Sequence, residues 1–174
     1  MRRFFSTTTL RIYTDGSFIR NHGGGMGIYF PNNEHPSLSI PYPKTLSIPP
    51  TNQRCELMAV SCAMVIHTVW FRERDCIIYT DSEYAINSLT KYCNVWNKNG
   101  WRKMNGQPVK NTDLLIPMSV MFNKTPNLSF QYVRAHTGKL DEHSLNNNIA
   151  DAYARKGTTF PYDPSSYRSS APEA

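Results

Sequence analysis

Long apolar runs are absent from this sequence, because none approaches the roughly 18 residues that a membrane-spanning helix needs. Cysteine is scarce as well: there are four cysteines, and no two of them form the C-x-x-C pattern of many zinc and redox sites. We expect no secretory leader before them. We therefore expect reduced thiols in an intracellular protein, rather than a zinc site or a disulfide framework.

Acidic residues are missing from the first nine positions, which are instead basic and rich in hydroxyl groups. Such a start is typical of organelle transit peptides, although this one is very short for that purpose. We expect a location in the cytoplasm or the nucleus, with the mitochondrion as the alternative.

Positive charge exceeds negative charge, with 19 Lys and Arg against 13 Asp and Glu, a net charge of +6. This balance favours a polyanionic partner such as nucleic acid, and a merely basic surface is the alternative. A length of 174 residues with 40% apolar residues fits one domain with a substantial core. We expect a short extension at 1–9, a folded domain at 10–157 and a disordered tail at 158–174.

The residue pattern predicts an α/β fold, a mixed sheet with helices on both faces. The glycine-rich run at 23–27 lacks the spacing of a phosphate-binding loop, so we expect it to ease a hairpin after a loop at 17–25. Six prolines at 31–50 confine any strand there to a short or edge position. The expected strands are 10–15, 26–30, 38–40 or 45–48, 76–80 and 128–133. The expected helices are 53–70, 82–89, 112–122 and 145–156.

The tripeptide Tyr-Thr-Asp occurs twice, ending at Asp15 and at Asp81, each time at the end of an expected strand. If these two strands pair, their carboxylates lie a few ångströms apart. Two negative charges that close are unfavourable unless a cation lies between them. The alternative for Asp15 alone is an ordinary turn residue.

Two further acids belong to helices: Glu56 near the start of the long helix and Asp151 within the last one. Four carboxylates with no cysteine or histidine cluster suit a hard cation, Mg²⁺ or Mn²⁺. With two such ions the natural chemistry is in-line attack of water on a phosphodiester. The alternatives are a helix-dipole partner for Glu56 and an ordinary helix charge for Asp151.

The segment 91–110 interleaves aromatic and basic side chains, and we name it the basic arm. Its tryptophans could be core residues, but their basic neighbours favour a nucleic-acid surface. The residues concerned are Trp96, Lys98, Trp101, Arg102 and Lys103.

At this point the chain resembles the catalytic domain of type 1 ribonuclease H. The first matching stretch is Tyr-Thr-Asp-Gly-Ser at 13–17, and six more follow in the order of the family, at 51–59, 79–84, 96–101, 108–114, 133–138 and 147–155. Together they span roughly residues 10–157. The resemblance implies a five-stranded sheet whose first three strands are antiparallel. It also implies cleavage of the RNA strand of an RNA–DNA hybrid.

The resemblance also assigns roles to single positions. It implies that Asp15, Glu56, Asp81 and Asp151 bind two Mg²⁺ ions, which Mn²⁺ could replace. His136 matches the loop histidine that handles protons or product release. Asn21, Asn52 and Gln53 match positions at the RNA strand, Thr51 matches part of a phosphate pocket for the DNA strand, and the basic arm matches the protrusion that grips the hybrid.

The chain departs from the family pattern near its last helix. Ala135 stands where glycine is common, and the loop after it is longer, so that His143 could compete with His136. Asn148 stands where a second acid is common, so a helper carboxylate is missing. We expect no separate N-terminal hybrid-binding domain, and hence no processivity through such a module.

We therefore interpret the sequence as a monomeric, Mg²⁺-dependent endonuclease that leaves 5′-phosphate and 3′-hydroxyl ends. Its expected tasks are primer removal and hybrid clearance. The alternatives are a non-catalytic hybrid-binding module and the ribonuclease H part of a reverse-transcribing element. The basic arm and the lack of a polymerase sequence favour a stand-alone enzyme.

Overall fold

A five-stranded sheet forms the centre of the molecule in the computed structural model, which describes residues 8–135 and 140–158. The strand order is β3-β2-β1-β4-β5. The first three strands pair antiparallel, and β4 and β5 continue the sheet in parallel with β1. This confirms the predicted mixed sheet. The strands are β1 (Leu10–Ile19), β2 (Gly23–Tyr29), β3 (Leu38–Pro41), β4 (Cys76–Thr80) and β5 (Leu128–Tyr132).

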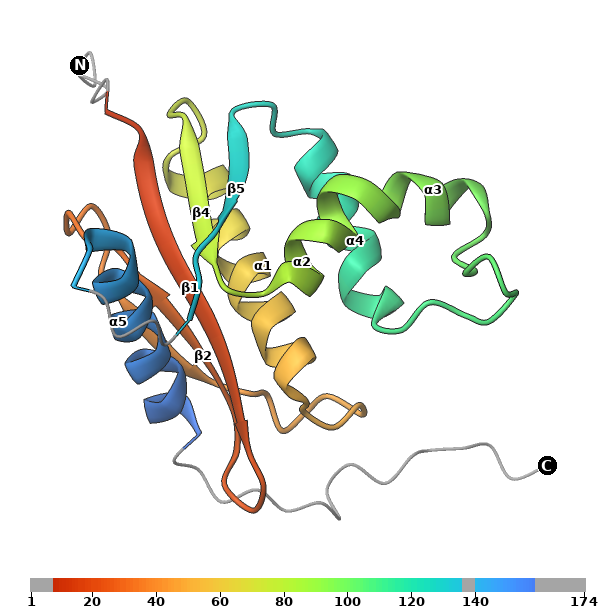
Figure 1. The fold of residues 1–174 in the computed structure, drawn as a ribbon, viewed down its shortest axis with the longest axis horizontal. Coiled ribbons are helices and arrows are strands. Elements are labelled where there is room, and N and C mark those ends of the chain that lie inside the picture. The colour runs from red at the N-terminus through yellow and green to blue at the C-terminus, as the bar shows by residue number, and fades with distance from the viewer. Residues whose placement is uncertain (1–7, 136–139, 159–174) are drawn as a thin grey trace.

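Helices cover both faces of this sheet, with α5 on one face and α1 on the opposite face (Figure 1). A second group, from α2 to α4, lies beyond α1 and β5 in the same view. The α-helices are α1 (Asn52–Trp70), α2 (Glu83–Asn87), α3 (Cys93–Lys98), α4 (Thr112–Asn123) and α5 (Glu142–Gly157). A short π-helical turn, η1 (Ser88–Tyr92), joins α2 to α3.

The main core lies between the sheet and α1. Alternate residues of a strand point to opposite faces, so Ile12 and Ile78 face α1, where they are fully buried with Leu57 and Met64. Burial of such side chains from water contributes about 1.5–3 kcal/mol each. A smaller cluster on the other face lies under α5 and includes Tyr13 and Tyr79. Residues on one face of the strands therefore pack against α1, and residues on the other face pack against α5.

The first hairpin is longer than the sequence predicted. β1 continues to Ile19 and β2 begins at Gly23, so only residues 20–22 turn, with Asn21 in the left-handed region at φ 69°. The expected loop at 17–25 is therefore wrong. The glycines of β2 serve packing instead: a Cβ on Gly27 would lie 2.0 Å from the Ala150 carbonyl oxygen, and one on Gly25 would lie 2.1 Å from that of Ala154. They let α5 lie directly on the sheet.

Two other boundaries also differ from expectation. The alternative third strand at 45–48 does not form, whereas 38–41 does. α5 begins at Glu142 rather than 145, because the Asp141 side chain caps it by accepting a hydrogen bond from the Ser144 amide. The last described residue, Thr158, is buried and donates its hydroxyl to the Arg155 carbonyl oxygen.

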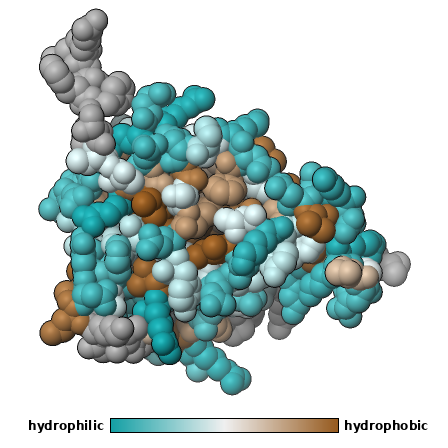
Figure 2. Space-filling model, turned by 45° about the horizontal axis from the view of Figure 1, so that its top comes forward, coloured by the Kyte–Doolittle hydropathy of each residue, from teal (hydrophilic) through white to brown (hydrophobic). Residues whose placement is uncertain are grey.

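Apolar side chains on the face seen in Figure 2 form small patches between hydrophilic ones. The most exposed large apolar side chains of α1 are Val69 and Trp70, at 64% and 67%. Among the described residues, no helix is long and apolar enough to cross a membrane. All four cysteines are free thiols, as expected.

Candidate functional site

The two Tyr-Thr-Asp strands are neighbours. β1 and β4 pair in parallel, with Tyr13 opposite Tyr79 and Thr14 opposite Thr80. Asp15 follows within β1, which continues to Ile19 and so does not end at this acid as expected, and Asp81 follows the last residue of β4. The two acids therefore lie at the edge where β4 ends and β1 continues. Side-chain alternation places both on the face that α5 covers. The predicted pair of carboxylates is thus formed by the strand register itself.

Glu56 reaches this edge from the other face, through the first turns of α1. The Thr51 hydroxyl caps the helix by accepting from the Arg54 amide. Gly16 permits the close approach, because a Cβ there would lie 2.0 Å from the Glu56 nitrogen. The Ser82 hydroxyl then donates to Glu56 Oε2 at 2.6 Å, which fixes the carboxylate beside the end of β4.

Asp151 approaches from α5. Its Oδ1 accepts from Arg155 Nε at 2.9 Å, an ion pair one helical turn apart and partly exposed. Another residue of α5 contacts the acid that follows β4: Asn147 Nδ2 donates to Asp81 Oδ2 at 3.3 Å. Sequence reasoning did not identify Asn147 as a site residue, although it lies within a matched stretch.

The charges of the four acids act on one another. Burial, followed by repulsion from Asp81 and Asp151, raises the pKa of Asp15 to about 8. Burial and repulsion from Asp81 also raise the pKa of Glu56, against the opposing effect of the Ser82 hydrogen bond. The structure therefore brings Asp15, Glu56, Asp81 and Asp151 into one electrostatic neighbourhood.

This donor set fits a hard divalent cation, because carboxylate oxygens are its preferred ligands and a cation would relieve the repulsion. Within residues 8–135 and 140–158, however, no three Asp, Glu, His or Cys side chains are gathered tightly enough to ligate a single ion as they stand. The carboxylates are near enough to affect one another's ionisation, but no three of them converge on one point.

The residues expected at the RNA strand lie at two places. Asn21 is exposed in the turn of the first hairpin. Asn52 and Gln53 are exposed at the start of α1, and Asn52 Oδ1 accepts from the Phe18 amide at 2.8 Å. Thr51 is exposed, and its hydroxyl oxygen is engaged in the helix cap.

The basic arm, which includes α3, extends away from the sheet (Figure 1). Trp96 packs against Tyr92 and Trp101, with ring centroids 5.4 and 6.4 Å apart. Both tryptophans are partly buried against the core, so the core alternative is confirmed in part. The expected basic residues of the arm, Lys98, Arg102 and Lys103, are exposed. A hollow of about 470 Å³ lies on this arm, with Trp96, Arg102 and Lys103 in its lining.

The two loop histidines differ. His136 lies outside the described residues. His143 is partly buried in the first turn of α5, where its Nδ1 lies 2.8 Å from the Tyr13 hydroxyl and its ring stacks on Tyr79 at 4.7 Å. His143 is therefore engaged with the sheet.

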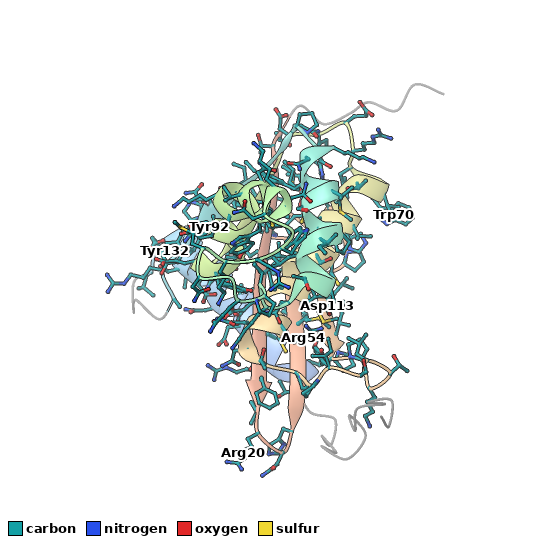
Figure 3. The ribbon with its side chains drawn as sticks, turned by 90° about the vertical axis from the view of Figure 1, so that its right-hand side faces the viewer. Arg20, Arg54, Trp70, Tyr92, Asp113 and Tyr132 are labelled. Carbon is teal, nitrogen blue, oxygen red and sulfur yellow. The ribbon has the colours of Figure 1, made fainter. Side chains whose placement is uncertain are left out.

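A buried arginine supports the site and was missed by sequence reasoning. Arg54 is 3% exposed, and its two terminal nitrogens donate to the two carboxylate oxygens of Asp113 at 2.9 and 2.6 Å. Its Nε donates to the Tyr42 hydroxyl. Figure 3 shows Arg54 and Asp113 side by side, joining α1 to α4. Both residues lie in stretches that match the ribonuclease H family, but the resemblance assigned no role to either of them.

Comparisons with known proteins agree with this geometry. The family model for RNase H matches residues 7–159. The chain is 36% identical over 156 residues to "Ribonuclease H" of Haemophilus influenzae, a match that covers 87% of this chain and 91% of the relative. It is also 36% identical over 133 residues to "Probable ribonuclease H" of Acanthamoeba polyphaga mimivirus, a match that covers 75% of this chain but only 56% of the relative.

The fold is similar to that of solved ribonuclease H domains. The solution structure of the PFV RNase H domain superposes with a TM-score of 0.67 at 23% identity, covering 88% of this chain and 96% of that chain. This likeness concerns the fold. Together with the family model and the sequence relatives, it shows that the chain belongs to the ribonuclease H family of hydrolases.

Proposed function

We propose that this protein hydrolyses the RNA strand of RNA–DNA hybrids with two Mg²⁺ ions held by Asp15, Glu56, Asp81 and Asp151. The observation that carries the proposal is the crowding of these acids where β4 ends beside β1, with the pKa of Asp15 raised to about 8. A protein without cations gains nothing from such crowding. Family membership supplies the substrate class.

Cations held by these four carboxylates would supply an activated water and stabilisation of the leaving oxygen, and the products would carry 5′-phosphate and 3′-hydroxyl ends. Asn52 selects the RNA strand. Because its Oδ1 is engaged by the Phe18 amide, its Nδ2 remains the donor toward a ribose 2′-hydroxyl, the group that distinguishes RNA from DNA. The basic arm provides sequence-independent contacts to phosphates.

A non-catalytic hybrid-binding module fits these observations less well. Four carboxylates beside a phosphate backbone weaken the binding of a polyanion unless cations neutralise them. We propose primer removal and the clearance of hybrids as the tasks of the enzyme, and a monomer as its working state.

The test is cleavage of one labelled RNA strand presented as an RNA–DNA hybrid, as double-stranded RNA and as single-stranded RNA. We expect cleavage of the hybrid alone with Mg²⁺, cleavage of the same substrate with Mn²⁺, and none with EDTA. Hybrid binding without cleavage in either metal would contradict the proposal.

A further inference from the structure

Asn147 connects α5 to the acid at the end of β4. Its side chain is 2% exposed, and its Nδ2 donates to Asp81 Oδ2. This orientation of the amide suits an ionised Asp81, because the reversed amide would set oxygen against oxygen. Asn147 also lies one helical turn before Asp151, so a single helix carries one acid of the site and the residue that holds another.

The second polar atom of Asn147 has no donor. Its Oδ1 is buried and receives no hydrogen bond from any residue in the described part of the chain. A buried acceptor left in this state is costly, and such atoms in folded proteins call for an explanation. Because both polar atoms belong to one amide, Oδ1 lies within a few ångströms of the Asp81 carboxylate. The unpartnered acceptor is therefore at the carboxylate site, not elsewhere in the core.

We propose that Asn147 is a positioning residue of the carboxylate centre, which holds Asp81 by Oδ2 and offers its own Oδ1 to the hydration shell of the cation. The inference rests on the metal site of the proposed function. A neutral amide performs this task without adding another negative charge to a site that already contains four. Groups that orient metal ligands in this way commonly change metal affinity or activity by about 10–100-fold when removed.

The experiment is a calorimetric titration of the metal-free full chain with Mg²⁺. Asn147→Leu fills a similar volume but removes both polar atoms, and Asn147→Ala removes the amide outright. We expect either change to raise the Mg²⁺ dissociation constant about tenfold. Asn148→Ala is the matched control, since Asn148 is the next residue of α5 and is exposed. It should leave the constant within about twofold.

Three further readouts separate positioning from simple structural support. In EDTA, Asn147→Leu should unfold at or above the temperature of the wild type, because an unsatisfied acceptor has been removed. With a hybrid substrate it should lower kcat about tenfold and leave KM within about twofold. On an Asp81→Asn background, Asn147→Leu should change Mg²⁺ binding much less than it does in the wild type, since the oxygen that Asn147 orients has lost its charge.

Unchanged Mg²⁺ affinity in both Asn147 variants would overturn the inference, as would a tenfold effect that persists on the Asp81→Asn background. The proposed function is tested separately. A wild type that binds Mg²⁺ but cleaves no hybrid would refute the function and leave the binding result to support Asn147. A wild type that binds no Mg²⁺ would refute both.

Discussion

The Tyr13 hydroxyl lies 2.8 Å from His143 Nδ1, although 130 positions separate the two residues in the chain. The Tyr13 ring stacks on Tyr79 at 4.6 Å, and the His143 ring stacks on Tyr79 from α5 at 4.7 Å. These three aromatic side chains join β1, β4 and the first turn of α5. The same helix carries Asp151, so the cluster fixes where that acid meets the sheet. This arrangement favours an anchoring role for His143 over the proton-handling role that the longer loop suggested.

Tyr13→Phe and His143→Phe should each remove this hydrogen bond and keep the ring stacking, and Tyr13→Phe also removes the contact of the Tyr13 hydroxyl with the Asn146 side chain. We expect His143→Phe to lose about 1 kcal/mol of unfolding free energy in urea titrations, and Tyr13→Phe to lose at least as much. The double variant should lose no more than Tyr13→Phe alone, because that variant already lacks the bond between the two residues. Additive losses would show that the two residues act independently.

The raised pKa of Asp15 predicts how stability depends on pH without metal. An unperturbed aspartate titrates near 3.9, whereas burial and the neighbouring acids raise the pKa of Asp15 to about 8. Between these values the folded state keeps a proton that the unfolded chain has released. Rising pH therefore lowers the contribution of this group to stability across that window.

Asp15→Asn should accordingly unfold at a higher temperature than the wild type at pH 8 in EDTA. We expect a difference of about 3 °C or more, equivalent to about 1 kcal/mol, which shrinks toward pH 4. Saturating Mg²⁺ should stabilise the wild type at pH 8 and have less effect on the variant. Equal melting curves at pH 5 and pH 8 for both proteins would contradict the predicted crowding.

The Arg54–Asp113 pair predicts an asymmetric response to substitution. Asp113→Ala leaves the guanidinium of Arg54 buried at 3% exposure without its carboxylate, and we expect a loss of about 3 kcal/mol. Arg54→Met leaves Asp113, whose side chain is 42% exposed and can be hydrated, so the loss should be smaller. Urea unfolding of both variants tests the order, and equal losses would contradict it.

The fold could be predicted from the sequence where one pattern determines both local structure and pairing. The repeated Tyr-Thr-Asp alone indicated β1 and β4, and predicted that Asp15 would lie beside Asp81 if the two strands paired. Family resemblance then indicated the strand count and the roles of Glu56 and Asp151. These features could be predicted because the segments that form them carry distinctive residue patterns.

The remaining differences arise from tertiary contacts that residue types do not reveal. The glycines of β2 resemble a loop in the sequence, but in the structure Gly25 and Gly27 are the places where α5 touches the sheet. The start of α5 is set by the Asp141 cap, and the spacing of apolar residues does not predict this cap. Arg54 and Asn147 lie in matched stretches, yet only their contacts with Asp113 and Asp81 disclose what they do.

The basic arm predicts a salt-dependent affinity for the hybrid. Replacing Lys98, Arg102 and Lys103 by alanine should weaken binding of the hybrid at low salt. It should also reduce the slope of log affinity against log salt by roughly 0.7–0.9 for each phosphate that no longer has a cationic partner. Arg72 and Lys124 line a separate hollow near the start of β5, so Arg72→Ala with Lys124→Ala is the control and should leave the slope unchanged. Similar slopes for the arm variant and the wild type would show that the arm is not part of the binding surface.

The most direct test of the account is the single-turnover cleavage rate of a bound hybrid, measured for the wild type and for Asp15→Asn, Glu56→Gln, Asp81→Asn and Asp151→Asn. We predict a loss of at least about 100-fold in rate for Asp15→Asn and Asp81→Asn, equivalent to about 2.7 kcal/mol, with hybrid affinity equal to or tighter than that of the wild type. Full cleavage by Asp15→Asn or Asp81→Asn in Mg²⁺ would contradict the claim that the carboxylates on β1 and directly after β4 are required for the reaction.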